Sequence, residues 1–368
     1  MSLRVGIVGL PNVGKSTLFN ALLKKQAALV ANYPFATIEP NVGVVEVPDE
    51  RLEKLADVIE RDSSTSLGMT SGGGIGVTKR PPIKYATVEF VDIAGLVKGA
   101  AEGAGLGNKF LAHIREVDVI VQLMRDFNDG DVVKEGSVDP KSDYEVVTDE
   151  LILKDLETLM RVKDSKELRM KGQEKRKAVI DRLCDALNSG KRAAEVVSEE
   201  DEELVRDLCL LTSKKEIKVL NVSETDPRLA EGVGENGEVV ICAKVEAEVA
   251  ALSPDEAREY LQALGLEESG LNKLIRKAYE TLGLISFLTA GEMESRAWTI
   301  RTGMKAPQAA GVIHTDFEKK FIKAKCCDYA DFVSLGGWKN AAEKGKVRME
   351  GRDYVMKDGD VVEFMVGS

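Results

Sequence analysis

The chain of 368 residues contains only two histidines and five cysteines. Zinc sites are built from Cys and His ligands at short, characteristic spacings. The cysteines here show no such spacing. We therefore expect no zinc site, and we expect the reduced thiols that are typical of a cytosolic protein.

Long apolar runs are also missing, since none reaches the roughly 20 residues that a membrane-spanning helix needs. The first apolar run, residues 5–8, is short and lacks the layout of a signal peptide. We therefore expect a cytoplasmic protein without a membrane partner. We also expect it to be a monomer.

Positive charge is in the minority, with 51 Lys and Arg against 62 Asp and Glu, which gives a net charge of -11. A surface coated for nucleic-acid binding would be basic, so any such contact must use a local patch. Apolar residues make up 43% of the chain and charged residues 31%, a balance that is typical of globular proteins.

The N-terminal region carries a glycine-rich phosphate-binding motif. Residues 9–16 read G-L-P-N-V-G-K-S, between the strand-like residues 5–8 and a helix-like segment. Backbone N–H groups of such a loop cradle phosphates, its Lys contacts the β- and γ-phosphates, and its Ser binds Mg²⁺. We therefore expect a nucleoside triphosphate site formed by Asn12, Val13, Gly14, Lys15, Ser16 and Thr17.

Two further elements indicate a magnesium ion bound with the nucleotide. Residues 92–95 read D-I-A-G at the end of a strand-like segment. In GTPase-like proteins this Asp holds Mg²⁺ through water, and the Gly senses the γ-phosphate. We expect Ser16, Thr37 and Asp92 to be the metal-site residues, although Thr37 could instead be an ordinary threonine of an exposed loop.

The base-reading element departs from the guanine-specific pattern N-K-x-D, because residues 221–224 read N-V-S-E. A guanine reader uses the Asp carboxylate to accept from N1–H and N2–H₂, and adenine offers no matching pair. Glu224 is longer by one methylene, and mismatched polar groups discriminate strongly. We expect Asn221, Val222 and Glu224 to form a base site that does not select guanine. Residues 242–244, C-A-K, resemble the S-A-K element whose backbone contacts the base.

The order of the segments predicts three domains. Residues 1–133 and 212–282 alternate between strands and helices, as in a parallel α/β sheet. Residues 134–211 form a helical insertion, and residues 283–368 form a small α+β domain with strands at 297–300, 354–356 and 361–365. The Ser-, Thr- and Gly-rich residues 63–78 are expected to be a surface insertion.

The helical insertion is predicted to be an antiparallel pair of helices joined near residues 188–190. Its first part is basic, and residues 195–203 are acidic. These charges fit either a solvated helix face or a docking face for an anionic partner such as RNA. The basic residues are Arg161, Lys163, Lys166, Arg169, Lys171, Lys175, Arg176 and Lys177.

Several motifs occur together along the chain: G-L-P-N-V-G-K-S-T, N-Y-P-F-A-T-I-E-P-N, D-I-A-G-L-V, G-A-G-L-G-N-K-F-L, N-V-S-E, F-L-T-A-G-E and R-A-W-T. With them the chain resembles the YchF subfamily of Obg-like ATPases over essentially its whole length. The resemblance implies a P-loop GTPase-like α/β domain with an inserted α-helical hairpin, followed by a C-terminal α+β TGS domain of ubiquitin-like β-grasp shape. It also implies ATP preferred over GTP, with Val222 beside the adenine, and association with the ribosome or translation machinery. RNA would then be contacted by the hairpin and the TGS domain.

The group that orients the attacking water is less evident. Ras-like enzymes place a Gln directly after D-x-x-G, but Leu96 stands there and can neither donate nor accept. His113 could orient the water or act as a base, or it could be an ordinary histidine on a helix surface. In the K⁺-activated relatives, an Asn at the position of Asn12 helps to coordinate a monovalent cation; alternatively Asn12 only bonds its own loop. Lys15 completes the predicted catalytic set.

The leading hypothesis is therefore an ATP-hydrolysing molecular switch that docks on ribosomes. Leu96 also allows a nucleotide-gated binding scaffold with negligible hydrolysis. A conventional GTPase is opposed by Val222 and Glu224. A phosphotransferase acting on a small metabolite is the weakest alternative, because no acceptor-binding lid is evident.

Overall fold

The computed structural model describes residues 3–30, 41–67, 80–93, 106–127, 139–166, 168 and 170–367. The chain divides into two compact units, each made from two stretches of sequence. The first unit is Met1–Val45 with Val88–Leu282, and the second unit is Glu46–Thr87 with Gly283–Ser368. None of the helices in the described parts of the chain is long and apolar enough to cross a membrane.

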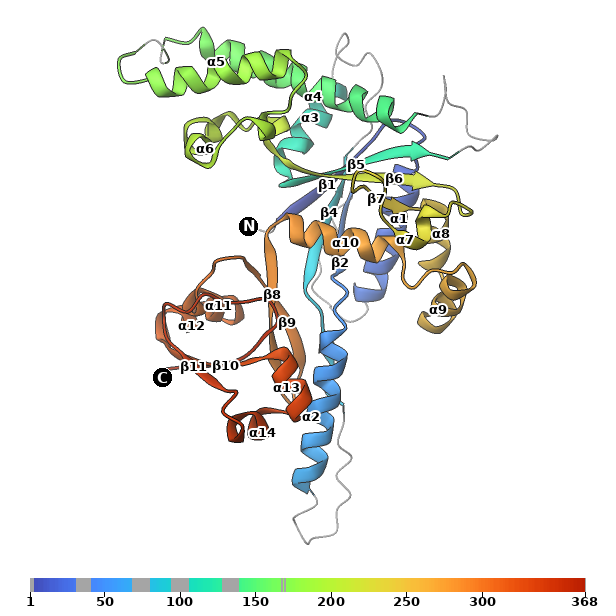
Figure 1. The fold of residues 1–368 in the computed structure, drawn as a ribbon, viewed down its shortest axis with the longest axis vertical. Coiled ribbons are helices and arrows are strands. Elements are labelled where there is room, and N and C mark those ends of the chain that lie inside the picture. Colours follow the sequence, from blue (N-terminus) through green and yellow to red (C-terminus); the bar gives the residue numbers. More distant parts are fainter. Residues whose placement is uncertain are drawn as a thin grey trace. The chain divides into compact units, whose positions relative to one another are not determined.

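The first unit is built around a six-stranded sheet with the strand order β2-β4-β1-β5-β6-β7 (Figure 1). β1 is parallel to β4 and β5, β5 is parallel to β6, and β6 is parallel to β7. β1, β5 and β7 are buried along almost their whole length, as expected where helices cover both faces of a parallel sheet, whereas β2 and β4 are buried mainly on one face. The predicted P-loop α/β fold is confirmed. The strands are β1 (Arg4–Val8), β2 (Val42–Glu46), β4 (Thr87–Asp92), β5 (Val119–Asp126), β6 (Lys215–Val222) and β7 (Val239–Ile241).

Helices pack against this sheet through buried apolar side chains. Phe110 and Ile114 of α3 share one cluster with Val147 and Leu151 of α4 and with Val8 of β1. α10 packs on β6 and β7, and α1 lies against α8. The helices of this core are α1 (Lys15–Val30), α3 (Leu106–Glu116), α4 (Pro140–Lys163), α7 (Arg228–Glu231), α8 (Ala243–Val249), α9 (Pro254–Ala263) and α10 (Gly270–Thr281).

The helical insertion is formed by α4 and α5 (Glu174–Asn188), which lie side by side. Leu156 and Leu159 of α4 pack with Ile180 and Leu183 of α5 in a core of their own. The predicted hairpin is confirmed, but the position of its turn was wrong: the two helices are joined by residues 164–173. Residues 188–190 instead end α5, where Gly190 takes a φ of 79°. A glycine after a helix marks its C-terminus but not which helix it packs against. The chain continues into the short α6 (Glu199–Val205).

Asp155 fastens α4 to the chain that returns from the insertion to β6. Its carboxylate accepts hydrogen bonds from the backbone N–H groups of Leu211 and Thr212, both at 2.8 Å, and from the Thr212 hydroxyl at 2.6 Å. Asp155 is only 2% exposed. A carboxylate can be buried this deeply because donors replace its water. The start of the insertion is therefore tied to the segment that leads back into the sheet of the first unit.

The second unit contains another six-stranded sheet, with the order β11-β10-β12-β8-β9-β3. β8 and β9 form an antiparallel hairpin, β12 is parallel to β8, and β10 is antiparallel to β12 and β11. A parallel central pair with antiparallel neighbours is the β-grasp arrangement, so the predicted C-terminal fold is confirmed. The strands are β3 (Ile83–Lys84), β8 (Leu284–Ala290), β9 (Ser295–Arg301), β10 (Phe321–Asp328), β11 (Arg348–Glu350) and β12 (Asp360–Val366).

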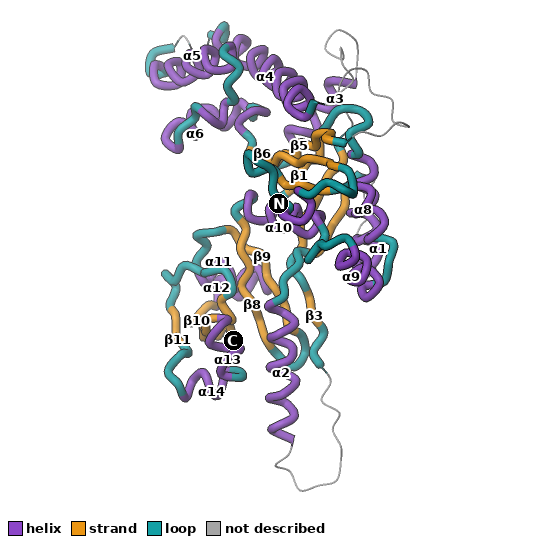
Figure 2. Tube along the Cα trace, turned by 45° about the vertical axis from the view of Figure 1, so that its right-hand side comes forward, coloured by secondary structure: helices purple, strands orange, loops and turns teal. Residues whose placement is uncertain are grey.

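Residues 46–87 contribute a helix and an edge strand to this second unit. α2 (Arg51–Leu67) packs on β8, β9 and α13 (Tyr329–Leu335), and β3 pairs with β9 (Figure 2). Leu52, Leu55 and Ala56 on α2 have no exposed surface. The two units therefore group these residues differently from the predicted domain borders, which stay a prediction. Most of residues 63–78 lie outside the described part of the chain. The other helices of the second unit are α11 (Ala306–Ile313), α12 (Thr315–Lys320) and α14 (Trp338–Glu343).

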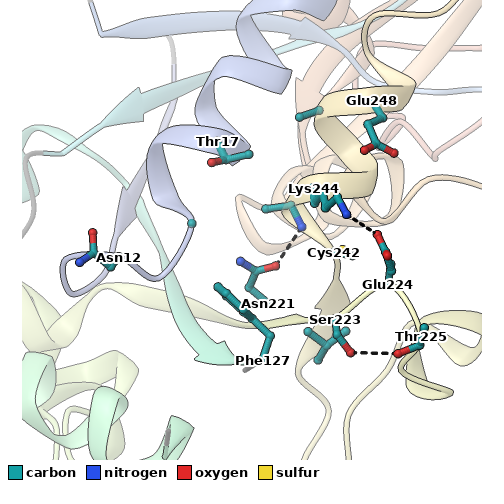
Figure 3. Close-up of a pocket in the computed structure, with 14 residues that line it drawn as sticks. Asn12, Thr17, Phe127, Asn221, Ser223, Glu224, Thr225, Cys242, Lys244 and Glu248 are labelled. Carbon is teal, nitrogen blue, oxygen red and sulfur yellow. Dashed lines mark hydrogen bonds and ion pairs between the residues drawn. The ribbon is translucent and has the colours of Figure 1, made fainter. Parts of the chain in front are cut away.

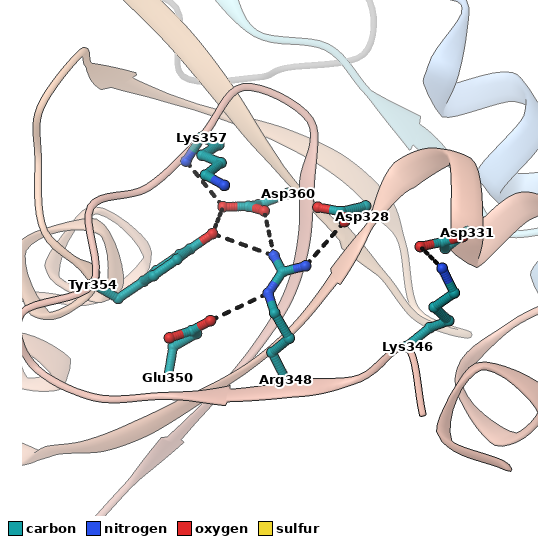
Figure 4. Close-up of polar contacts among 8 residues, drawn as sticks. All are labelled: Asp328, Asp331, Lys346, Arg348, Glu350, Tyr354, Lys357 and Asp360. Carbon is teal, nitrogen blue, oxygen red and sulfur yellow. Dashed lines mark hydrogen bonds and ion pairs between the residues drawn. The ribbon is translucent and has the colours of Figure 1, made fainter. Parts of the chain in front are cut away.

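Residues 354–356, which we predicted to be a strand, form only an isolated bridge from Val355 to Lys305. Asp360 organises this segment instead (Figure 4). Its carboxylate accepts from the Tyr354 hydroxyl at 2.8 Å and from the Lys357 N–H at 2.9 Å. Arg348 lies 3.4 Å from the same carboxylate. The segment folds around a buried charge, and an apolar pattern does not reveal that.

Arg348, on the edge strand β11, also pairs with two other carboxylates. It pairs with Asp328 at 2.9 Å and with Glu350 at 3.2 Å. The nearby pair of Lys346 and Asp331 at 3.3 Å connects the same chain to α13 (Figure 4). Because the Asp360 carboxylate has hydrogen-bond donors and a positively charged partner, it can be buried at 1% exposure.

Because α2 is covered by β8, β9 and α13, which all lie beyond residue 282, we expect a chain ending at residue 282 to be poorly folded. The cut would uncover Leu52 and Leu55, and burying each such side chain contributes about 1.5–3 kcal/mol. Thermal unfolding followed by circular dichroism should show a broader transition at lower temperature than in the full chain, with increased binding of a hydrophobic dye. A chain that also lacks residues 46–87, closed by a glycine-rich turn, should recover a cooperative transition. A chain ending at residue 282 that unfolds like the full-length protein would contradict this role of α2.

Candidate nucleotide-binding site

The predicted motifs meet at one edge of the first sheet because its strands are parallel. The carboxyl ends of β1, β4, β6 and β7 lead into the glycine-rich loop, Asp92, residues 221–224 and Cys242, respectively. In open parallel sheets, ligands bind at this edge. The register supports the assembly, since Ile7 lies opposite Asp92 and Asn221 lies opposite Ile241.

The glycine-rich loop has a backbone conformation that its sequence allows. Asn12 has a φ of 64° and Gly14 has a φ of 94°, and both residue types tolerate positive φ better than most. Helix α1 starts directly after the loop at Lys15. The backbone N–H of Leu18 already bonds the Gly14 carbonyl at 3.0 Å. The first N–H groups of a helix have no acceptor within the helix, so the start of α1, directly after the loop, favours an anion.

Lys15 and Asp92 meet at this edge. Their side chains form an ion pair and are only 11% and 22% exposed, respectively. The phosphate-contacting lysine and the metal-site aspartate of the prediction are therefore neighbours before any nucleotide is considered. An incoming phosphate and its cation would each find an oppositely charged partner here.

The oxygen donors at this edge fit a magnesium ion that arrives with a nucleotide. Ser16 lies in the first turn of α1, directly after Lys15, which pairs with Asp92. Within the described ranges, no group of three or more His, Cys, Asp or Glu side chains could hold a metal. Mg²⁺ does not need such a cluster, because it keeps several waters and binds through one or two protein groups and substrate phosphates. Thr37 and Leu96 lie outside the described residues.

Asn221 joins the glycine-rich loop to the base-reading loops. Its side-chain N–H donates to the Val13 carbonyl at 2.9 Å, and its side-chain oxygen accepts from the Ala243 N–H at 2.9 Å. Asn221 is 3% exposed. A Cβ on Gly14 would lie 2.3 Å from the Asn221 amide nitrogen. The glycine is therefore required by this contact as well as by its φ.

A cavity of about 920 Å³ opens beside these residues (Figure 3). Its lining includes the predicted Asn12, Gly14, Thr17, Asn221, Val222 and Glu224. Lys15 is not in this lining, which covers the base side of the site. Cys242 also lines the cavity, and burial raises the pKa of its thiol, so it stays protonated near neutral pH.

Glu224 does not present a free carboxylate to this cavity. It forms an ion pair with Lys244 at 2.8 Å, and the two side chains are 45% and 65% exposed, respectively. Hydrogen bonding to Glu224 raises the pKa of Lys244, which therefore remains charged. The position that would read guanine in an N-K-x-D protein is thus occupied by a carboxylate that is already paired.

Four residues that line the cavity were not predicted: Phe127, Thr225, Ala247 and Glu248. Phe127 directly follows β5, so the rule that parallel strands end at one edge could have found it. Glu248 lies one turn after Lys244 on α8, on the same helix face. Thr225 follows the N-V-S-E element, and its hydroxyl is 3.5 Å from that of Ser223.

His113 is not among the residues that line the cavity. It lies half-buried on α3, and its Nδ1 has no hydrogen-bond partner among the described residues. Residues 94–105, which lead into α3, lie outside the description. The structure therefore does not bring His113 together with the nucleotide loop, and its catalytic role stays a prediction.

The contact between Gly14 and Asn221 yields a test of the site. We expect Gly14→Ala to weaken nucleotide binding at least about tenfold, because the new Cβ collides with the Asn221 amide and φ is unfavourable. Gly190→Ala is the matched control, since Gly190 also has a positive φ but an added Cβ there would meet no described atom within 4 Å. It should cost about 1 kcal/mol of stability and leave binding unchanged. Binding is measured by titration with a fluorescent nucleotide, and equal binding by the two variants would argue against the contact.

Comparisons with known proteins cover the whole chain. A family model described as a 50S ribosome-binding GTPase matches residues 4–164, and a YchF GTPase C-terminal model, described as a protein of unknown function, matches residues 284–367. A Bacillus subtilis protein named ribosome-binding ATPase YchF is 47% identical, with 99% of both chains covered. An Escherichia coli O157:H7 protein of the same name is 45% identical, again with 99% of both covered.

A solved structure gives the same result for the fold. The YchF GTPase of Schizosaccharomyces pombe matches with a TM-score of 0.82 and 35% identity, over 99% of this chain and 98% of that one. The similarity therefore includes the glycine-rich loop, the helical insertion and the β-grasp sheet together. On this evidence the chain belongs to the YchF family.

Proposed function

We propose that the protein is an ATP-hydrolysing molecular switch that prefers ATP to GTP and binds ribosomes. The observation that carries the base preference is the Glu224 carboxylate, which is paired with Lys244 at the place where guanine would need a free acceptor. The names of the bacterial relatives, ribosome-binding ATPases, support both parts of the proposal.

The nucleotide would be bound by the residues of the glycine-rich loop and of the base-reading loops. Lys15 would release Asp92 to contact the β- and γ-phosphates, and Asn221 would keep the loop at a fixed distance from the base. Val222 is 2% exposed and lines the cavity, which suits a main-chain contact with adenine. Ser16, Asp92 and Thr37 would hold Mg²⁺, which neutralises phosphate charge when it is bound.

For the hydrolysis step we propose two candidate groups, Asn12 and His113. Asn12 lines the cavity on a backbone with positive φ, where it could help a K⁺ ion to contact the phosphates. His113 has a ring nitrogen without a partner among the described residues, and it could orient water after movement of the preceding residues. The two proposals differ in their dependence on the monovalent cation.

Steady-state hydrolysis by the full chain tests these roles. Lys15→Ala should lower ATP turnover by about 100-fold or more, since it removes a charge that stabilises the transferring phosphoryl group.

K⁺ should accelerate wild-type hydrolysis over Na⁺, and Asn12→Ala should abolish that difference. Equal rates in both salts, with a loss of rate in His113→Ala, would move the role to His113. If even single-turnover assays with ribosomes show no hydrolysis, the protein is a nucleotide-gated scaffold.

We propose that the helical hairpin supplies a ribosomal contact through unneutralised lysines. Lys163 and Arg176 are paired with Asp181 and Asp207, each at 2.6 Å. Four exposed lysines of the hairpin have no ion-pair partner among the described residues: Lys166, Lys171, Lys175 and Lys177. Free cations on a chain of net charge -11 form a local patch that can attract RNA phosphates. Residues 283–368 would be a TGS domain that adds a second contact, and ribosome binding would place the protein in the cytoplasm.

Reversing Lys175 and Lys177 to Glu should weaken co-sedimentation with purified bacterial ribosomes at moderate salt at least about threefold. Arg176 is left unchanged, because its reversal would break the pair with Asp207. Reversal of the exposed Lys54 and Lys191 is the control, since it changes the net charge equally at other surfaces. Nucleotide affinity should stay near wild type in both variants. Ribosome binding that falls equally in both would point to net charge alone, and unchanged binding would make the hairpin a solvated spacer.

A further inference from the structure

We propose that Lys244 is a positioning residue for base selection: it holds the Glu224 carboxylate in an ion pair, so that this carboxylate cannot accept hydrogen bonds from guanine. The inference rests on the proposed adenine-nucleotide function and concerns how the same pocket rejects guanine. Both residues line the cavity, and the ion pair lies across its base-reading side (Figure 3).

The two residues are held on separate loops by a common support. Glu224 lies two residues after the end of β6, and Lys244 lies in the first turn of α8. Asn221 at the end of β6 accepts from the Ala243 N–H, directly before Lys244. This hydrogen bond from the backbone of residue 243 to the Asn221 side chain fixes the spacing of the two loops. The 2.8 Å ion pair therefore forms between two side chains whose backbones are already positioned.

Lys244 has one carboxylate partner at this position, although a second lies nearby. Glu248 lines the same cavity one helical turn later, but its carboxylate accepts a hydrogen bond from the Tyr260 hydroxyl. Glu224 has no other partner among the described residues. The ammonium of Lys244 is therefore directed to Glu224, and Lys244 is the partner that holds the Glu224 carboxylate in place.

The ion pair changes what Glu224 can recognise. A guanine clamp needs carboxylate oxygens that accept from both N1–H and N2–H₂. Here the ammonium donates to one of these oxygens and places a positive charge beside the donors of an incoming guanine. Guanine would have to displace Lys244, whereas adenine makes no demand on this carboxylate. The free-energy cost of displacing Lys244 therefore arises for guanine and not for adenine. A mismatched polar site discriminates between ligands in this way.

The length of Glu224 fits this role. A carboxylate on a shorter side chain would stand closer to the backbone of residue 224 and farther from the first turn of α8. The additional methylene extends the carboxylate toward Lys244 while moving it from the position used by the Asp of N-K-x-D. The Asp-to-Glu difference and Lys244 thus act together.

The test measures dissociation constants of ATP, GTP and ITP with the full-length protein in Mg²⁺. Lys244→Met should tighten GTP binding about threefold to fivefold and leave ATP near wild type, because a partly exposed ion pair has a modest strength. ITP lacks the 2-amino group, so its gain should be smaller than that of GTP. Glu224→Asp combined with Lys244→Met should give a larger gain for GTP. Lys244→Arg keeps the ion pair and should keep the wild-type ratio.

Two controls separate this effect from loosened structure. The exchange Glu224→Lys with Lys244→Glu restores an ion pair but leaves no acceptor at position 224, so GTP should remain excluded. Lys24→Met removes another lysine of the first unit, one that bonds the Ala247 carbonyl rather than a carboxylate, and it should not alter the ratio. Thermal unfolding verifies that each variant is folded.

Wild-type protein that binds GTP at least as tightly as ATP would overturn the proposed function. Wild-type preference for ATP, together with an unchanged ATP-to-GTP ratio in both Lys244→Met and the double variant, would overturn the role of Lys244 alone and leave the base to be read by the backbone. Equal gains for ATP, ITP and GTP would also overturn it, since they would indicate a wider pocket rather than a freed acceptor.

Discussion

The buried side-chain amide of Asn221 is the contact on which the nucleotide site depends. It donates to the glycine-rich loop at Val13 and accepts from the start of α8 at Ala243. One planar group therefore sets the distance between the phosphate end and the base end of the cavity. Loss of such a buried pair of hydrogen bonds costs about 1–3 kcal/mol for each group left unsatisfied. A side-chain amide carries a donor and an acceptor on one planar group. Only Asn and Gln have such an amide, and Asn is the shorter of the two.

Around this contact, the site combines a fixed frame with charges that can exchange partners. Lys15 pairs with Asp92, and Lys244 pairs with Glu224. Phosphate and metal would bind to the two residues of the first pair, so nucleotide binding would replace one set of ionic contacts by another. The second pair lies at the base and need not open for adenine. The same kind of interaction thus has a different consequence at the phosphate-binding and at the base-reading part of the site.

Much of the fold and of the site could be predicted from the sequence, because the signals are local. The glycine-rich loop needs particular residues at fixed spacing, and buried parallel strands are short apolar runs. The partner of Glu224 could not be predicted in the same way, since Lys244 lies on another element. For the same reason Gly190 was read as the turn of the hairpin, although it only ends α5. A strand was predicted at residues 354–356 from their apolar pattern, and such a pattern does not reveal the hydrogen bond of Tyr354 to Asp360 that shapes this segment. Thr37 and Leu96 lie outside the described residues, so their predicted roles stay predictions.

The two-part construction of the second unit has a consequence for synthesis on the ribosome. α2 and β3 leave the exit tunnel early, but β3 pairs with β9 roughly 200 residues later in the chain. Until β8 and β9 follow, the apolar face of α2 with Leu52 and Leu55 has no native cover. Contacts of such long sequence separation form late and leave exposed surface in the meantime. The apolar face of α2 is therefore completed only after most of the chain has been translated, so the second unit forms last although one of its helices is made among the first.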